Sequence, residues 1–311
     1  MARDSRADII DDDPFREKQS EIHRVHSQRD AGGTIHFNLS GESNSQQQGM
    51  WGVNFQQQPQ MHDGGLWHFG EEEKRHLLLA TGAFTLALGL MRVGGIIFGL
   101  PTMGTSAWLF TLILSLPVML IAVGPAFILH EIGHKIVAKY YGCWAEFRSD
   151  PRGLKMGVGI SAILGFVFMA PGAVMVAGNV TRRQNGHIAI AGPLVNLSLF
   201  LIGIPLGGLI LVLMGTTEPS ATGYLVEDGF NWQSMVWDAI SFWVSANLIL
   251  GLFNMMPFGP LDGLKVKDWN EGAWLGLVLI FAIPVIFWFS TPWSPMVLVV
   301  HMYSLFLMYQ I

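Results

Sequence analysis

The stretch WLFTLILSLPVMLIAVGPAFILHEIGHKIVAKY, residues 108–140, decides how this chain is organised. Its first two thirds are almost entirely apolar and exceed the roughly 20 helical residues that cross a lipid bilayer. Its last third carries His130, Glu131 and His134 directly after that apolar run. Ionisable side chains at membrane depth are energetically costly, so their presence here indicates a functional site.

His130, Glu131 and His134 form an H-E-x-x-H pattern. On a helix, positions i and i+4 lie on one face, so the two histidines can hold one metal ion between them. Glu131 lies beside them, where it can take a proton from an attacking water molecule. The pattern predicts a zinc site in a membrane-embedded helix.

The overall composition is that of a multi-pass membrane protein. Of the 311 residues, 51% are hydrophobic and only 13% are charged, whereas soluble domains carry about 25% charged residues. The single cysteine, Cys143, excludes an intrachain disulfide and a cysteine-rich zinc site, and we expect it to be a small apolar packing residue. No basic stripe points to nucleic acid as a partner.

The N-terminal part differs in character from the rest. Residues 1–70 are polar, include two short glutamine tracts and hold few aliphatic residues, so we expect a disordered cytoplasmic extension. The acidic run Glu71–Glu73 is typical of the first turn of a helix. A membrane-embedded domain is therefore predicted over residues 71–311, with its core at 107–265.

The fold class predicted is an all-α polytopic membrane protein with about six transmembrane helices. Pro117 and Gly124–Pro125 are expected to kink or break the second of them. Arg92 interrupts the first, and we favour snorkelling to the interface over an orientation toward the bundle interior. The six apolar segments lie at about 77–99, 107–141, 187–214, 235–256, 272–289 and 295–310.

The region between the second and third segments has a pattern of its own. Residues 154–169 are apolar but too short for a crossing, which favours a re-entrant or interfacial helix. Trp144–Arg148 before them has strand-like alternation, and Ala170–Val176 after them is typical of a short extended segment. A small membrane-associated β-region is therefore predicted.

Lysine and arginine are distributed unevenly among the loops. They occur in the loops after the second and fourth segments and are absent from 100–106, 215–234 and 290–294. By the positive-inside rule, both termini of this multi-pass cell-membrane protein are cytoplasmic, and the histidine pair lies toward the cytoplasmic end of its helix. This topology requires that 154–169 does not cross.

Two histidines do not complete a catalytic zinc site, which usually has three protein ligands. The sequence Pro257–Gly263 ends the fourth apolar segment at the same predicted face and contains the carboxylate of Asp262. Proline-interrupted backbone at this depth is tolerated only against protein or a wet cavity. Asp262 is therefore a candidate third ligand, and the alternative is a residue of a helix-terminal turn.

Three motifs together make the chain similar to the site-2 protease family of intramembrane zinc metalloproteases, and archaeal members in particular. The likeness covers about residues 125–265. The motifs are His130-Glu131-x-x-His134, Ala191-Gly192-Pro193-Leu194-Val195-Asn196, and Asn254-x-x-Pro257-x-x-Pro260-Leu261-Asp262-Gly263.

This resemblance implies a role for each motif. His130, His134 and Asp262 would ligate one zinc ion, and Glu131 would be the catalytic base. Asn254 would polarise the scissile carbonyl or bind the oxyanion, and Asn196 would lie near the site and help to hold substrate. The segments at 144–148 and 171–177 would form a β-region that receives an unwound substrate strand.

The leading hypothesis is proteolysis of a transmembrane protein substrate within the bilayer. Water would reach the site through a polar opening lined or rimmed by Lys135 and Lys139. One alternative is a non-catalytic scaffold or pseudoprotease that binds transmembrane helices; the intact Glu131 argues against it. Another is a metal transporter, which the clustering of candidate ligands at one depth disfavours.

Overall fold

The computed structural model of the chain describes residues 67–169, 171–177, 180–215, 223–226, 229–292 and 294–309. The chain divides into two units, residues 1–61 and 62–311, and every described residue belongs to the second. Residues 1–66, which make up nearly all of the extension expected to be disordered, lie outside the described residues.

Long apolar helices dominate the described part, which confirms the all-α polytopic class predicted from the sequence. Five helical segments are long and apolar enough to cross a membrane. They are α3 (Glu71–Arg92) with its continuation through a π-helical turn (Gly95–Gly99) and α4 (Leu100–Met103), α5 (Thr105–Tyr140), α7 (Arg182–Met214), α8 (Trp232–Asn254) and α10 (Glu271–Ser290).

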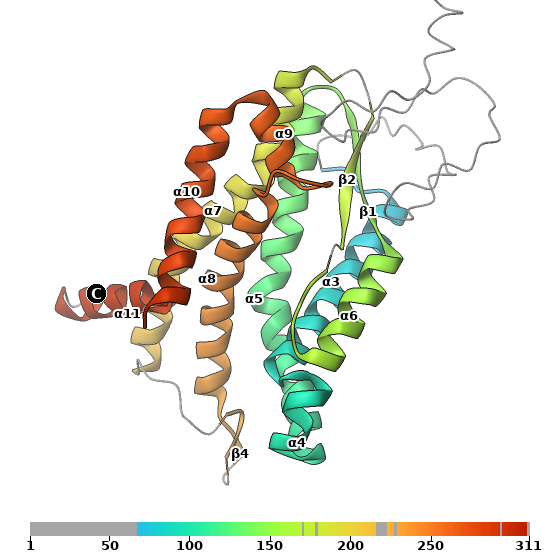
Figure 1. Cartoon of the computed structure of the whole chain (residues 1–311). Helices are drawn as coiled ribbons and strands as arrows, with labels where there is room; N and C mark the ends of the chain where they lie inside the picture. Colours follow the sequence, from blue (N-terminus) through green and yellow to red (C-terminus); the bar gives the residue numbers. More distant parts are fainter. Residues whose placement is uncertain are drawn as a thin grey trace, which may run out of the picture. The chain divides into compact units, whose positions relative to one another are not determined.

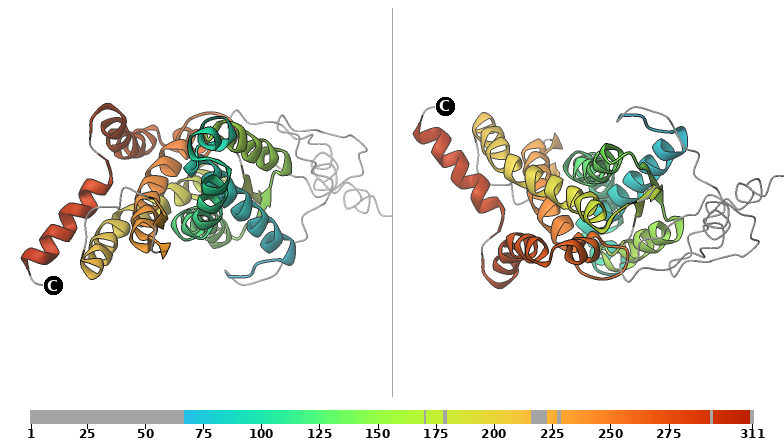
Figure 2. Two further views of the ribbon diagram at one scale, coloured as in Figure 1. Left: turned by 90° about the horizontal axis from the view of Figure 1, so that it is seen from below. Right: turned by 90° about the horizontal axis from the view of Figure 1, so that it is seen from above.

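The sixth apolar segment expected from the sequence forms α11 (Met296–Met308). It has 13 residues, fewer than the roughly 20 that a straight crossing takes. It packs against α7 and runs sideways to α10 (Figure 1). The views along the helices show α11 at the edge of the bundle, beside α7 (Figure 2).

The centre of the bundle is made by α5, α7 and α8, each of which packs against the other two. In Figure 1, α3 and α6 (Pro151–Leu164) lie on one side of α5, and α7, α8 and α10 lie on the other. A short helix, α9 (Asp262–Trp269), follows α8 and packs against α7. The centre of the bundle therefore brings segments distant in sequence together along α5.

Side-chain caps fix where several helices begin. Thr181 and Gln184 form a reciprocal capping box at the start of α7. Asn231 and Asn270 accept hydrogen bonds from the backbone at the starts of α8 and α10. These polar side chains satisfy N–H groups that have no partner within the helix.

The predicted β-region is present, and the segment expected to be re-entrant or interfacial forms a short helix between its two strands. β1 (Trp144–Ser149) pairs antiparallel with β2 (Gly172–Ala177), and Trp144 lies opposite Ala177. The intervening α6 packs against α3 and ends at Gly165, whose φ of 66° is left-handed. Because the start of β1 and the end of β2 meet, this segment enters and leaves at the same end of α5, as the charge distribution predicts.

The structure decides between alternatives at two places. α5 continues from Thr105 to Tyr140 through Pro117 and Pro125, so of the kink or break expected at these residues, the break does not occur. Neighbouring helices can stabilise a proline-containing helix that would be interrupted in isolation.

The contacts of Arg92 favour an orientation toward the bundle, which was the alternative to snorkelling. Its Nε donates to Asp238 Oδ2 of α8 over 2.8 Å, and its guanidinium lies 5.2 Å from the ring centroid of Tyr224. Tyr224 precedes the short pair β3 (Leu225–Val226) and β4 (Gly229–Phe230) and donates its hydroxyl to the same Asp238 oxygen over 2.7 Å. Arg92 therefore pairs with a carboxylate of the neighbouring helix α8.

Candidate metal centre

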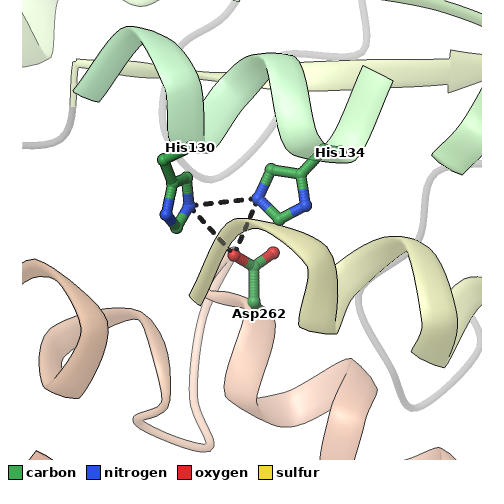
Figure 3. Close-up of side chains that lie close together, drawn as sticks. All are labelled: His130, His134 and Asp262. Atoms are coloured by element: carbon green, nitrogen blue, oxygen red, sulfur yellow. Dashed lines mark hydrogen bonds and ion pairs between the residues drawn. The ribbon is translucent and has the colours of Figure 1, made fainter. Parts of the chain in front are cut away.

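The ligand atoms predicted from the sequence converge on one point. Nε2 of His130 and Nε2 of His134 lie 3.0 Å apart. Oδ2 of Asp262 lies 3.4 Å from the first and 3.0 Å from the second. The imidazoles project from adjacent turns of α5 toward the Asp262 carboxylate (Figure 3). All three residues are buried, and they form a group of potential metal ligands within the described residues.

These separations fit a zinc ion. Ligands at tetrahedral corners about 2.1 Å from zinc lie about 3.4 Å from one another. The ring hydrogen bonds are equally informative. Nδ1 of His130 faces Asn196 Oδ1 at 2.6 Å, and Nδ1 of His134 faces the Ile188 carbonyl at 2.7 Å.

Both ring partners are acceptors, so each Nδ1 carries the donated proton. In the neutral rings, the two Nε2 lone pairs then face each other and a carboxylate oxygen inside a buried site. Three acceptors in contact repel one another unless a cation lies between them. The donor set and its surroundings therefore fit a bound metal ion.

Asp262 reaches the histidines because α9 is fastened to the start of α7. The rings of Trp269 and His187 lie 4.6 Å apart, edge to face, and Arg182 pairs with Asp268 at 3.0 Å. Asp262 is the first residue of α9, so these contacts at the far end hold the helix that carries the carboxylate against α7.

A cation lies beside the Asp262 carboxylate. Lys265 Nζ lies 3.5 Å from Oδ1, the oxygen that does not face both histidines. One oxygen is thus directed to the metal position and the other to a cation.

Comparison with curated proteins identifies relatives across this region. The protein "Putative zinc metalloprotease MJ0611" of Methanocaldococcus jannaschii is 38% identical over 175 residues, which cover 55% of this chain and 81% of that protein. The chain belongs to the site-2 protease family. The relatives' names support a zinc metalloprotease function, as the ligand geometry does.

Two further relatives carry the same description. YwhC of Bacillus subtilis is 29% identical over 161 residues, covering 49% of this chain and 68% of that protein. Rip3 of Mycobacterium tuberculosis is 27% identical over 149 residues, covering 47% of this chain but only 28% of its own length. No family model and no solved structure matches the chain.

Glu131 lies next to the ligands and against the β-region. Its side chain is buried, and the backbone N–H of Val174 in β2 is directed at its carboxylate. β2 pairs with β1 on one side, and among the described residues no strand pairs with its other edge. The candidate base therefore lies beside a strand edge that remains open for pairing.

Gly192 is a site feature whose function the sequence motif did not reveal. A Cβ atom at this position would overlap Nε2 of both His130 and His134. Glycine is therefore required where α7 passes the two rings, because any side chain would occupy the ligand position.

Asn196 lies at the site, but its contacts differ from those expected of a substrate-binding residue. Besides accepting from His130, it donates to Asn247 Oδ1 and to the Ala126 carbonyl, both over 3.0 Å. Asn196 and Asn247 are both fully buried. Asn247 was not singled out from the sequence, although an amide within an apolar helix is a signal that could have identified it.

Asn254 occupies the C-terminal end of α8. Its Nδ2 donates to the carbonyl of Leu250, one turn earlier, over 3.0 Å. In the described part of the chain, no hydrogen bond joins it to His130, His134 or Asp262. Its role toward the substrate carbonyl stays a prediction.

Lys135 does not line a polar opening as expected. It is 2% exposed and forms an ion pair with Glu73, which is 1% exposed. Lys139 donates to the carbonyl of His68 over 3.2 Å. The lysines at the end of α5 thus hold the segment that enters α3. Cys143 is buried among apolar side chains, as predicted.

Proposed function

We propose that the protein is an intramembrane zinc metalloprotease that hydrolyses peptide bonds within or near transmembrane segments of other membrane proteins. The observation that carries the proposal is the position of the two histidine ligands in α5. His130 lies ten residues, or about 15 Å along the helix axis, before the last residue of α5. The histidines therefore lie along an apolar helix, which supports a site within the membrane.

The residues of this chain divide the chemistry among them. Bound zinc would supply a Lewis acid that polarises water and the peptide carbonyl. Glu131 would remove a proton from the attacking water as the water oxygen bonds to the carbonyl carbon of the substrate. The same proton would pass to the leaving nitrogen as the carbon–nitrogen bond breaks. Asn196 and the Ile188 carbonyl would keep both histidines in the ligating tautomer.

The substrate would be bound as an extended segment. A peptide bond inside a helix is shielded by its own turn, so a transmembrane substrate must unwind locally before attack. The open edge of β2 offers backbone N–H and C=O groups to such a segment. Because Val174 of β2 contacts Glu131, a strand added at this edge would lie beside the candidate base.

The proposed location is the cell membrane, with both termini and the entrance to the site on the cytoplasmic side. Single cysteines at Asn185 and Ser220, in a Cys143→Ala background, test this orientation. An impermeant reagent added outside should label position 220 and not position 185. The reverse pattern would invert the topology.

The function is tested with purified protein and a model transmembrane substrate in liposomes. We expect cleavage that a zinc chelator abolishes and added zinc restores. Glu131→Gln should retain zinc, because the carboxylate is not among the converging ligand atoms, and should lose cleavage. Zinc-loaded wild-type protein that binds transmembrane helices but leaves every one intact would refute the proposal and favour a scaffold.

A further inference from the structure

Glu73 and Lys135 form a buried ion pair outside the ligand group. Glu73 lies in the first turn of α3 and Lys135 follows His134 in α5. The Lys135 ammonium also lies 3.9 Å from the centroid of the Phe69 ring. A buried charge is retained only when it is paired, because removing it from water costs several kcal/mol. The pair therefore holds the start of α3 firmly against α5.

The same Glu73 carboxylate makes a second contact. While Oε2 pairs with Lys135, Oε1 accepts the backbone N–H of Phe147 over 3.2 Å. Phe147 belongs to β1, and its ring packs edge to face on Phe127 of α5. One carboxylate therefore connects the metal-binding helix to the backbone of the β-hairpin.

These contacts continue to the candidate base. Phe147 of β1 lies opposite Val174 of β2, and the Val174 N–H is directed at Glu131. Lys135 and Glu131 lie one turn apart in α5. The contacts thus form a closed ring that leaves α5 at Lys135, passes through Glu73 and both strands, and returns to α5 at Glu131.

We propose that Glu73 is a positioning residue that sets the open edge of β2 relative to the metal centre, and through it the placement of the substrate backbone. The proposal rests on the function proposed above. A carboxylate is suited to this task because its two oxygens satisfy a side-chain cation and a backbone N–H at once. Without it, the Phe147 amide loses its side-chain acceptor, and the hairpin loses a direct tie to α3.

A second ion pair of α3 provides a matched control. Arg92 and Asp238 join the other end of α3 to α8. Neither residue contacts β1, β2 or the ligand group through any hydrogen bond or ion pair within the described residues. Asp238→Asn should therefore loosen the docking of α3 without moving the edge of β2.

The experiment compares two double variants that both remove the buried charges. Glu73→Gln with Lys135→Met keeps an acceptor oxygen for the Phe147 N–H. Glu73→Leu with Lys135→Met has a side chain of similar size without that oxygen. Neither double variant leaves an unpaired charge buried, which is what makes a single substitution in such a pair costly, so both variants should fold and bind zinc.

Two measurements separate the variants. Hydrogen exchange of the backbone at 144–149 and 172–177 reports the hairpin without any need for activity. Cleavage of a model substrate gives KM, kcat and the scissile bond. In the leucine variant we expect exchange about tenfold faster and KM about tenfold higher than in the glutamine variant, as loss of one buried hydrogen bond predicts. The zinc content should be equal, and Asp238→Asn should resemble wild type in both measurements.

The outcomes distinguish this inference from the proposed function. Equal hairpin exchange in the two double variants would refute the positioning role, whether or not the wild type is active. A wild-type protein that cleaves no substrate would instead refute the proposed function. Separated exchange with identical KM and an identical scissile bond would overturn the claim that the edge of β2 places the substrate.

Discussion

Asn196→Leu tests whether this asparagine serves the metal or the substrate. Leucine keeps a similar volume but removes the oxygen that accepts from His130 over 2.6 Å. The ring of His130 then loses the partner that fixes its tautomer and orientation. Loss of such a partner typically weakens metal binding by about 10- to 100-fold. We therefore expect the zinc dissociation constant to rise by that factor, with a corresponding fall in activity at limiting zinc.

The stability cost follows from the other bonds of Asn196. The variant leaves the Nδ1–H of His130 and the Oδ1 of Asn247 buried without their present partners. Each such group costs about 1–3 kcal/mol, so the free energy of unfolding should fall by about 2–6 kcal/mol. Adding Asn247→Leu removes the stranded acceptor, so the double variant should recover stability while its zinc affinity stays low.

The assay is competition between the purified protein and a zinc chelator of known affinity. Ser198→Ala is the matched control on α7, because its exposed hydroxyl bonds to the Leu194 carbonyl of its own helix and to no other group among the described residues. It should leave zinc affinity unchanged. If Asn196→Leu binds zinc as tightly as wild type but shows a raised KM, Asn196 holds substrate and the reasoning from its hydrogen bonds is refuted.

Three further substitutions test other contacts. Gly192→Ala should abolish zinc binding measured by metal analysis, because the new Cβ overlaps both ligand nitrogens; a normal zinc content would show that α7 can move away from α5. Lys265→Met should weaken zinc binding about tenfold by removing the cation beside Asp262 Oδ1, and Lys265→Arg should restore it; equal affinity in both variants would remove Lys265 from the site. Asp238→Asn should lower the free energy of unfolding by about 2 kcal/mol, because Arg92 loses its carboxylate partner, and should leave zinc binding intact; an unchanged denaturation midpoint would contradict this.

Much of the architecture could be predicted because it depends on local patterns. Apolar length predicts the long helices, and the i, i+4 spacing places His130 and His134 on one face whatever surrounds them. The short length of residues 154–169 and the distribution of lysine and arginine among the loops together indicate that this segment does not cross the membrane. Asp262 was identifiable from its motif, although spacing alone left a turn residue as an alternative.

The partners of individual side chains depended on how the helices pack. The apolar residues around Arg92 in the sequence favour snorkelling. In the structure α8 packs close enough for Arg92 to pair with Asp238, 146 positions away in the chain. The sequence around Lys135 predicts a polar residue near a membrane surface. In the structure Lys135 is buried and paired with Glu73 of α3, which lies 62 positions away in the chain. No local pattern contains either partner.

The sequence by itself determined the helices, the ligand pair and the end of the molecule at which the ligands lie. These follow from the periodicity and polarity of continuous segments. Only the tertiary structure decided that Asn196 and the Ile188 carbonyl orient the histidines, that Gly192 leaves room for them, and that Glu73 ties the hairpin to α5. Each of these contacts joins separate elements, so its formation depends on the packing of whole helices and not on the residues beside it in the chain.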